Sequence, residues 1–239
     1  MRVQLDGMEV AYSEVGRGEP LVLIHGLGDD HRAWRRTIPD LMLHRCAFLY
    51  DLRGHGQTTL GTPDGTLRQL SNDLLQLMDG VGLEQVDIAG FSLGGTIAMR
   101  FAIDFPLEVR GLVHSDPQLR ETLDRDTADV YAESPAELEE GLLIRRQSTA
   151  DPRGYGNACA AMAALNAAPL DPELGRITVP TLIVASDKDK HCPPKAAEII
   201  AAGIKGSRLE IVPGAGHPIP VERPGELAAS INSFLAEIA

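Results

Sequence analysis

Short apolar runs alternate with longer helical patterns along most of this 239-residue chain. The runs are rich in Val, Ile and Leu and mostly continuous, which is typical of strands that are covered on both faces. They occur at LVLIHG (21–26), RCAFLYDLRG (45–54), QVDIAG (85–90), VRGLVHSD (109–116), TLIVASDKD (181–189) and RLEIVPGAG (208–216). Alternation of strands with helices predicts a parallel, doubly wound sheet.

Helical patterns lie between these runs, and a hairpin pattern precedes them. Helices are expected at Trp34–Leu43, Thr66–Gly80, Leu93–Phe105, Pro194–Ile204 and Pro224–Ile238. The segments RVQLDG and MEVAYSEVG predict a hairpin that turns at Asp6-Gly7. The predicted fold class is therefore α/β, with a doubly wound, mostly parallel sheet of about eight strands.

One long segment, residues 117–175, shows no strand pattern. Within it, SPAELEEGLLIRR has the signature of a helix start, with Ser134 as N-cap and Pro135 at the first helical position. GNACAAMAALNAA predicts a second helix, rich in small residues. We interpret 117–175 as a short helical cap inserted between 1–116 and 176–239, which together form the core. The alternative is a crossover connection with no role of its own.

Net charge excludes some classes of partner. The chain carries 34 acidic and 22 basic residues, a net charge of −12. Nucleic acids and anionic membranes attract basic surfaces, so neither is expected as a partner. The acidic residues are dispersed along the chain, which is typical of a solubilising surface. Formation of a homo-oligomer is compatible with this charge balance.

The cysteines and the N-terminus bear on the compartment. Cys46, Cys159 and Cys192 form no CxxC pair, and their odd number argues against a disulfide framework. Reduced thiols are the rule in the cytoplasm, which is the expected location. The first residues, MRVQLDGMEV, lack the apolar core of a signal peptide, and no apolar run is long enough to span a bilayer.

The stretch AGFSLGG places Ser92 between a predicted strand and a predicted helix. GFSLG matches the pattern Gly-x-Ser-x-Gly, in which a sharp turn lifts the serine clear of the sheet. Larger residues at Gly90 and Gly94 would collide with the strand and the helix. The helix N-terminus brings free amides and the positive end of a dipole beside the serine oxygen. These features predict a nucleophile that carries an acyl group.

A serine hydroxyl needs a base, and the base needs an orienting carboxylate. His217 lies in the loop after the last strand, at the edge of the sheet where parallel strands hold their sites. Asp189 follows the strand TLIVAS and is the preferred acid, with Asp187 and Asp116 as alternatives.

The remaining histidines fit a catalytic role less well. His25 is expected to hydrogen-bond within its loop, His55 belongs to a turn, and His114 is expected to be a core residue. His31, His44 and His191 lack a comparable setting.

Four motifs give the chain a resemblance to the α/β-hydrolases over nearly its whole length: HGLGDDHRAW, DLRGHGQT, GFSLGG and GAGHPIPVERP. The order Ser92, Asp189, His217 is that of the family's triad. The resemblance implies that HGLG is the oxyanion loop and that the backbone N–H groups of Leu27 and Leu93 form the oxyanion hole. It also implies a structural role for Arg53.

The resemblance points most closely to serine carboxylesterases and 3-oxoadipate enol-lactonases. Haloalkane dehalogenases and epoxide hydrolases carry aspartate where this chain has Ser92, which argues against both. The expected function is hydrolysis of a small, mostly apolar carboxylic ester or lactone through an acyl-enzyme, with no metal or other cofactor. A carbon–carbon bond hydrolase of ring-cleavage products and a cofactor-free perhydrolase or haloperoxidase are alternatives. A binding protein without catalysis is a further alternative, and the complete triad argues against it.

Substrate choice is expected to depend on the cap. Tyr131, Tyr155 and Met162 are its larger candidates to line a pocket, although packing of the cap helices onto the sheet explains them equally well. Arg145 and Arg146 are adjacent and are expected to be solvated.

Overall fold

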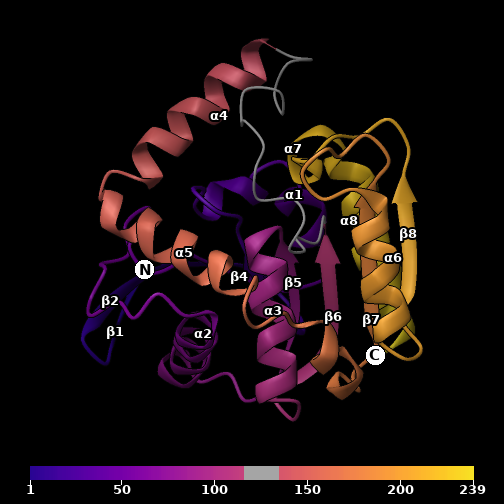
Figure 1. Ribbon diagram of the computed structural model, residues 1–239, viewed down its shortest axis with the longest axis horizontal. Helices are drawn as coiled ribbons and strands as arrows, with labels where there is room; N and C mark the ends of the chain where they lie inside the picture. The colour runs from indigo at the N-terminus through magenta and orange to yellow at the C-terminus, as the bar shows by residue number, and fades with distance from the viewer. Residues whose placement is uncertain (116–134) are drawn as a thin grey trace.

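An eight-stranded sheet runs through the centre of the protein (Figure 1). The computed structural model describes residues 1–115 and 135–239. The strands are β1 (Arg2–Leu5), β2 (Met8–Gly16), β3 (Pro20–Ile24), β4 (Cys46–Tyr50), β5 (Val86–Phe91), β6 (Val109–Ser115), β7 (Thr181–Ser186) and β8 (Arg208–Val212). They lie in the order β1-β2-β4-β3-β5-β6-β7-β8. Only the pairings made by β2 are antiparallel, so the predicted mostly parallel α/β fold is confirmed.

Helices cover both faces of this sheet. The α-helices are α1 (Ile38–Leu41), α2 (Leu67–Val81), α3 (Leu93–Asp104), α4 (Pro135–Ser148), α5 (Pro152–Ala164), α6 (Pro194–Gly203), α7 (Ile219–Glu222) and α8 (Pro224–Glu237). The described residues also include the 3-10 helices η1 (His31–Trp34) and η4 (Asp171–Arg176). The hairpin is confirmed as well, because Leu5 pairs with Met8 and Gly7 has a φ of 67°.

Each face of the sheet has its own apolar core. Val22 and Ile24 of β3 belong to the cluster that includes side chains of α2, α3 and α6. Leu21 and Leu23, the residues in between, belong to the cluster that includes side chains of α1 and α8. Successive side chains of a strand point to opposite faces, so a strand with helices on both sides must be apolar at every position. This requirement explains the continuous apolar runs of the sequence.

The predicted helix Trp34–Leu43 is wrong in extent. The chain there forms η1 and the short α1, with Thr37 between them. Pro39 has no backbone N–H to donate to the carbonyl four residues earlier, so it can stand only in the first turn of a helix. The Thr37 hydroxyl donates to the carbonyl of Pro220 (3.0 Å), which ties this break to the region of α7.

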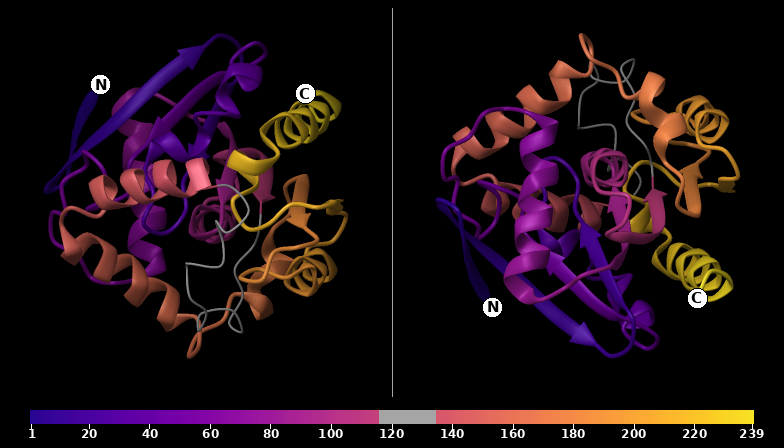
Figure 2. Two further views of the ribbon diagram at one scale, coloured as in Figure 1. Left: turned by 90° about the horizontal axis from the view of Figure 1, so that it is seen from above. Right: turned by 90° about the horizontal axis from the view of Figure 1, so that it is seen from below.

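The described part of the proposed cap, residues 135–175, is helical and contains no strand. Its helices α4 and α5 lie across the end of the sheet where the parallel strands finish (Figure 2). Near the start of α5 the backbone of Gly154 lies so close to that of Gly54 that a Cβ atom on Gly154 would overlap the Gly54 carbonyl. The start of α4 falls at Pro135 as predicted, while its predicted N-cap, Ser134, lies outside the described residues.

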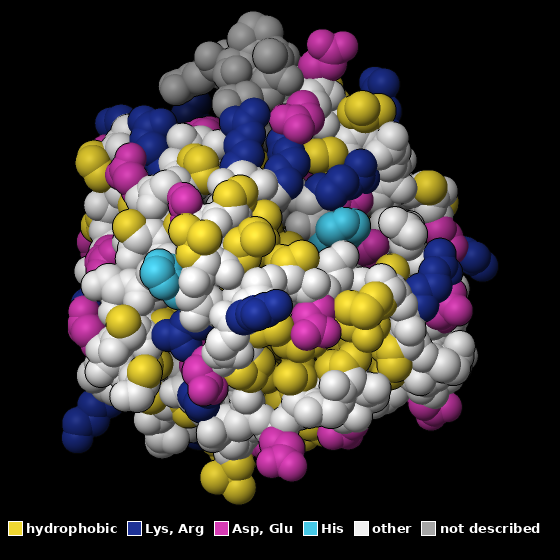
Figure 3. All heavy atoms as spheres, turned by 180° about the vertical axis from the view of Figure 1, so that it is seen from behind, with side chains coloured by type: hydrophobic (Ala, Val, Ile, Leu, Met, Phe, Trp, Pro, Cys, Tyr) yellow, Lys and Arg dark blue, Asp and Glu magenta, His cyan; other side chains and the backbone are white. Residues whose placement is uncertain are grey.

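The surface carries charge of both signs. Acidic side chains are scattered among basic ones over the face that Figure 3 shows, in keeping with their dispersal along the sequence. Among the described residues no helix is both long and apolar enough to cross a membrane.

The approach of Gly154 to Gly54 predicts how stability responds to substitution. Gly154→Ala should lower the free energy of unfolding by about 1–3 kcal/mol, because the added methyl forces the two backbones apart. Gly156→Ala, in the same helix, is the matched control, since no atom lies within 4 Å of a Cβ there. It should raise the free energy of unfolding by about 0.5–1 kcal/mol. Urea unfolding measures both, and equal stability of the two variants would contradict the packing described.

Candidate active site

Ser92 occupies a strained turn between β5 and α3. Its φ of 53° and ψ of −119° make it the only non-glycine residue with a positive φ among the described residues. Such a conformation costs about 1–3 kcal/mol and persists only when its surroundings enforce it. The Ser92 N–H donates to the carbonyl of Ser115 at the end of β6 (3.0 Å), and the Ser115 hydroxyl donates to the carbonyl of Gly90 (3.3 Å). The turn is thereby bound to the neighbouring strand.

The glycines around Ser92 are sterically required, as the sequence predicts. A Cβ atom on Gly90 would overlap the carbonyl of Gly94, and one on Gly94 would overlap the carbonyl of Ile24. The N-terminus of α3 therefore packs directly against the ends of β5 and β3. Any side chain at either glycine would move Ser92.

His217 connects Ser92 to Asp189. Its Nε2 atom lies 3.2 Å from Ser92 Oγ, and its Nδ1 atom lies 2.7 Å from Asp189 Oδ2. An ionised carboxylate accepts the proton of Nδ1, which leaves Nε2 to accept the proton of the serine hydroxyl. Ser92 is 3% exposed and Asp189 is 4% exposed, so bulk solvent has little access to either end of this hydrogen-bonded line. The structure thus brings together the three residues that the sequence selects.

Asp189 is held in place by its own loop. Its Oδ1 atom accepts hydrogen bonds from the backbone N–H groups of His191 (2.7 Å) and Cys192 (2.8 Å). Burial by itself would raise the pKa of Asp189, but the hydrogen bond and charge of His217, with the two backbone amides, lower the pKa below its usual value. The carboxylate is therefore ionised at neutral pH.

One of the two alternative acids, Asp187, has partners other than His217. Asp187 turns instead toward the loop after β8, where its Oδ1 atom accepts the N–H of Gly214 (2.6 Å). Lys188 lies 3.6 Å from its other oxygen. Asp116 lies outside the described residues.

The predicted oxyanion loop forms a tight turn beside Ser92. The Asp29 N–H donates to the Gly26 carbonyl (3.3 Å), with Leu27 and Gly28 at the centre of the turn. Gly28 has a φ of 78°, as the third position of a type II turn requires. A Cβ atom on Gly26 would lie 3.3 Å from the Cβ of Ser92. The turn therefore packs against the serine.

His25 fixes the direction of the Leu27 amide. Its Nε2 atom accepts the N–H of Leu52 (2.9 Å), so its Nδ1 atom carries the proton and donates to the Gly26 carbonyl (2.8 Å). Burial lowers the pKa of His25, which keeps the ring neutral. The Gly26 carbonyl and the Leu27 N–H belong to one trans peptide unit and point in opposite directions. The predicted hydrogen bonding of His25 within its loop is confirmed.

Leu93 opens α3, so its N–H has no acceptor within the helix. This amide and its neighbours carry the positive end of the helix dipole. An anion beside Ser92 Oγ would therefore meet a favourable field from α3.

The comparison with known families agrees with this geometry. Residues 21–230 match the model of the alpha/beta hydrolase family. The chain belongs to this family. The match covers most of the chain and supports hydrolase activity.

Individual relatives of this alpha/beta hydrolase span its full length. It is 28% identical to the 2-hydroxy-6-oxo-2,4-heptadienoate hydrolase of Pseudomonas putida, over 96% of this chain and 94% of that protein. It is 25% identical to 3-oxoadipate enol-lactonase 1 of Acinetobacter baylyi, over 100% of this chain and 94% of that one. The crystal structure of the enol-lactonase from Burkholderia xenovorans has the same fold, with a TM-score of 0.85 and 24% identity over 99% of this chain and 100% of that chain.

Other sequence-selected residues of the hydrolase lie outside the Ser92 site. Arg53 is structural, as expected, because it forms a buried ion pair with Asp73 at 2.5 Å. His114 is a fully buried residue of β6, and burial lowers its pKa to about 4. His55 is also buried, with its ring centroid 5.5 Å from that of His25.

The candidate pocket residues have different settings. Tyr155 is half-buried, and its hydroxyl accepts a hydrogen bond from Arg145 (3.3 Å). Met162 is 1% exposed and belongs to the larger core cluster, the setting expected of a residue that packs the cap onto the core. Tyr131 lies outside the described residues.

The expectation that Arg145 is solvated is wrong, although Arg146 is exposed. The Arg145 guanidinium lies over the Tyr155 ring, 5.7 Å from its centroid, and 3.0 Å from where a Cβ on Gly28 would be. The contact with Gly28 joins residues far apart in the sequence, so no local pattern could predict it.

His191 lies near the site and is not among the residues selected from the sequence. Its ring centroid lies 5.3 Å from that of His217, on the same loop that carries Asp189. Phe91 packs on His217 at 5.2 Å. The signal was the position of His191 two residues after the orienting acid, since the chain must turn back there to bond Asp189.

Two groups of metal-ligand side chains are found among the described residues. They are Asp189, Cys192 and His217, and Asp30, His31 and Asp51. In the first group Asp189 and His217 bind each other. In the second, His31 Nδ1 lies 2.6 Å from Asp51 Oδ1, while Arg32 donates to both carboxylate oxygens of Asp30. These polar atoms already have partners within the protein.

Proposed function

We propose that this alpha/beta hydrolase cleaves a carboxylic ester or lactone of a small, mostly apolar substrate, with Ser92 as the nucleophile. The observation that carries the proposal is the continuous hydrogen-bonded line from Asp189 through His217 to Ser92, at a turn strained to present the hydroxyl. In this arrangement each of the three groups has one role in acyl transfer. Similarity to an enol-lactonase of Acinetobacter baylyi supports the choice of bond.

Acylation begins when Ser92 Oγ attacks the carbonyl carbon of the substrate. His217 Nε2 takes the hydroxyl proton as the new carbon–oxygen bond forms, and Asp189 stabilises the resulting imidazolium. The negative oxygen of the tetrahedral intermediate accepts the N–H groups of Leu27 and Leu93. Each such donor is worth about 3–4 kcal/mol in the transition state. When the intermediate collapses, the bond to the leaving oxygen breaks and His217 gives that oxygen its proton.

Deacylation repeats these steps with water. His217 takes a proton from a water molecule, whose oxygen attacks the acyl carbon, and then returns a proton to Ser92 Oγ as the ester bond to the enzyme breaks. The products are a carboxylic acid and an alcohol, or a hydroxy acid from a lactone. These steps use side chains and backbone amides of this chain together with one water molecule.

Hydrolysis of a carbon–carbon bond in a ring-cleavage product is the second candidate. It is favoured by the similarity to the 2-hydroxy-6-oxo-2,4-heptadienoate hydrolase of Pseudomonas putida, which extends over 96% of this chain. The same serine, histidine and oxyanion amides would serve the cleavage of either bond. Assays with both kinds of substrate are therefore needed to distinguish the two candidate functions.

We further propose that residues 117–175 form a cap that sets specificity without supplying a catalytic group. Ser92, Asp189 and His217 all lie on the core, at the ends of β5, β7 and β8. The cap helices α4 and α5 cover the same end of the sheet. Of the predicted pocket residues, Tyr155 is half-buried, whereas Gly141 and Ile144 of α4 line a small cavity together with Phe91 and Pro218, the chain neighbours of Ser92 and His217. The free cysteines fit a cytoplasmic enzyme.

A substrate panel tests the type of bond. Short p-nitrophenyl esters, simple lactones and a 2-hydroxy-6-oxo-dienoate are offered to wild type and to Ser92→Ala, and kcat/KM is measured for each. We expect esters or lactones to be turned over by wild type, with the activity abolished in Ser92→Ala. Cleavage of the dienoate alone would replace this proposal with the carbon–carbon hydrolase.

The orienting role of Asp189 predicts a large loss on neutralisation. Asp189→Asn should lower kcat for the best ester by about 10⁴-fold, because the amide favours the wrong tautomer of His217. Asp187→Asn is the matched control: it removes a charge from the same loop but one that binds Gly214, so most of the turnover should remain. Near-wild-type turnover of Asp189→Asn with loss in Asp187→Asn would reverse the assignment.

A further inference from the structure

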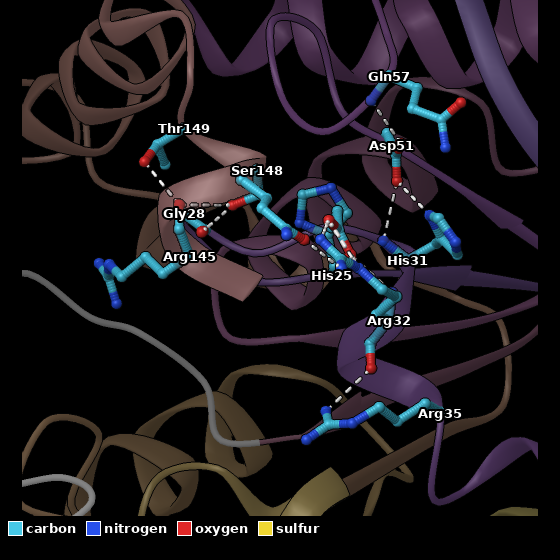
Figure 4. A network of polar contacts seen from close by, with 12 residues as sticks. His25, Gly28, His31, Arg32, Arg35, Asp51, Gln57, Arg145, Ser148 and Thr149 are labelled. Carbon is cyan, nitrogen blue, oxygen red and sulfur yellow. Dashed lines mark hydrogen bonds and ion pairs between the residues drawn. The ribbon is translucent and has the colours of Figure 1, made fainter. Parts of the chain in front are cut away.

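The C-terminal end of α4 is fastened to the oxyanion turn. The hydroxyl of Ser148 lies within hydrogen-bond distance of two carbonyls, that of Gly28 in the turn and that of Arg145 in its own helix (3.2 Å), and the contact with Gly28 is the closer one (Figure 4). The backbone carbonyl of Ser148 accepts the N–H of Gly56 (2.8 Å). Ser148 is 1% exposed, so the hydroxyl has little water to bond instead. One residue of the cap thus bridges two loops of the core.

Further contacts align the rest of α4 with the same core segment. Arg32 donates to Gln147 (2.6 Å), and Arg35 donates to Glu140 (2.8 Å). The Arg145 guanidinium packs on Gly28 at a position where any side chain would meet it. These contacts follow one face of α4 along residues that come directly after the oxyanion turn.

The turn that Ser148 contacts carries the Leu27 amide. His25 and the Asp29 N–H hold the Gly26 carbonyl at the start of the turn. Gly28 follows Leu27 and has a left-handed backbone conformation. Because glycine has no side chain, its backbone changes conformation easily. A hydrogen bond to the Gly28 carbonyl restrains the turn at the end that His25 does not reach.

We propose that Ser148 is a positioning residue for the oxyanion hole, acting from the cap through the Gly28 carbonyl. Its hydroxyl holds the turn Gly26–Asp29 so that the Leu27 N–H points at the oxygen that becomes negative beside Ser92. The inference rests on the proposed function. It adds that the cap takes part in transition-state stabilisation, although it supplies no group that touches the reacting atoms.

This role predicts a specific kinetic pattern. An oxyanion amide acts on the charge that develops in the transition state, so loosening it lowers kcat and leaves KM unchanged. Complete loss of one oxyanion donor costs about 10²–10³ in kcat. A residue that only steadies the donor should cost less, about tenfold.

The experiment compares Ser148→Ala with Thr149→Ala. Thr149 is the matched control because its hydroxyl, one residue further on, donates only within α4, to the Arg145 carbonyl (2.6 Å). For each variant we would measure kcat and KM on the best ester, the rate of Ser92 phosphonylation by a fluorophosphonate, and amide hydrogen exchange of the segment 25–30. Values of kcat are normalised to active sites titrated by the fluorophosphonate, so a misfolded fraction does not count.

We expect Ser148→Ala to lower kcat and the phosphonylation rate together by about tenfold, with KM unchanged and faster exchange in segment 25–30. Thr149→Ala should match wild type in all three. Equal behaviour of the two variants, or a lower melting temperature of Ser148→Ala with kcat unchanged, would overturn the inference. Absence of a Ser92 adduct in wild type is a different result, which refutes the proposed function and this inference with it.

Discussion

The strained backbone of Ser92 is the constraint on which the site depends. A φ of 53° at a residue with a side chain is sustained only by close packing on all sides. The packing comes from the Gly90 and Gly94 backbones, which contact each other and the end of β3. Because α3 must begin immediately after Ser92, the helix amides face the serine oxygen without any further device. The backbone of Gly94 also packs against the carbonyls of Ile24 and His25, so it fixes where the predicted oxyanion turn begins.

The second set of constraints comes from loops that hold one another. The segment after β4 binds the predicted oxyanion turn through the Leu52 amide and His25, and contacts α5 through Gly54 and α4 through Gly56. Breaking a buried polar contact costs more free energy than breaking one on the surface, because the group left behind has neither water nor a protein partner. Buried contacts therefore hold the site on the side of the proposed oxyanion hole. The proposed acid and base, Asp189 and His217, lie on the loops after β7 and β8.

The sequence was sufficient for those features that a local pattern encodes. Continuous apolar runs marked the buried strands, and glycines flanking Ser92 marked the turn. Asp189 and His217 could be selected because the carboxyl ends of parallel strands meet at one edge of the sheet. The placement of Arg145 and Ser148 could not be predicted. Ser148 and Gly28 are 120 residues apart, and no pattern in the sequence around either residue indicates the other as its partner. The break before α1 follows from the missing N–H of Pro39, a local signal that the predicted helix Trp34–Leu43 did not take into account.

The proposed role of Ser92 as the nucleophile of this alpha/beta hydrolase can be tested by treating the folded protein with a fluorophosphonate and mapping the adduct by mass spectrometry. We expect one phosphonylated peptide, containing Ser92, and no adduct when the reagent meets Ser92→Ala. An adduct on another residue, or a sample that hydrolyses esters while Ser92 stays unlabelled, would contradict it.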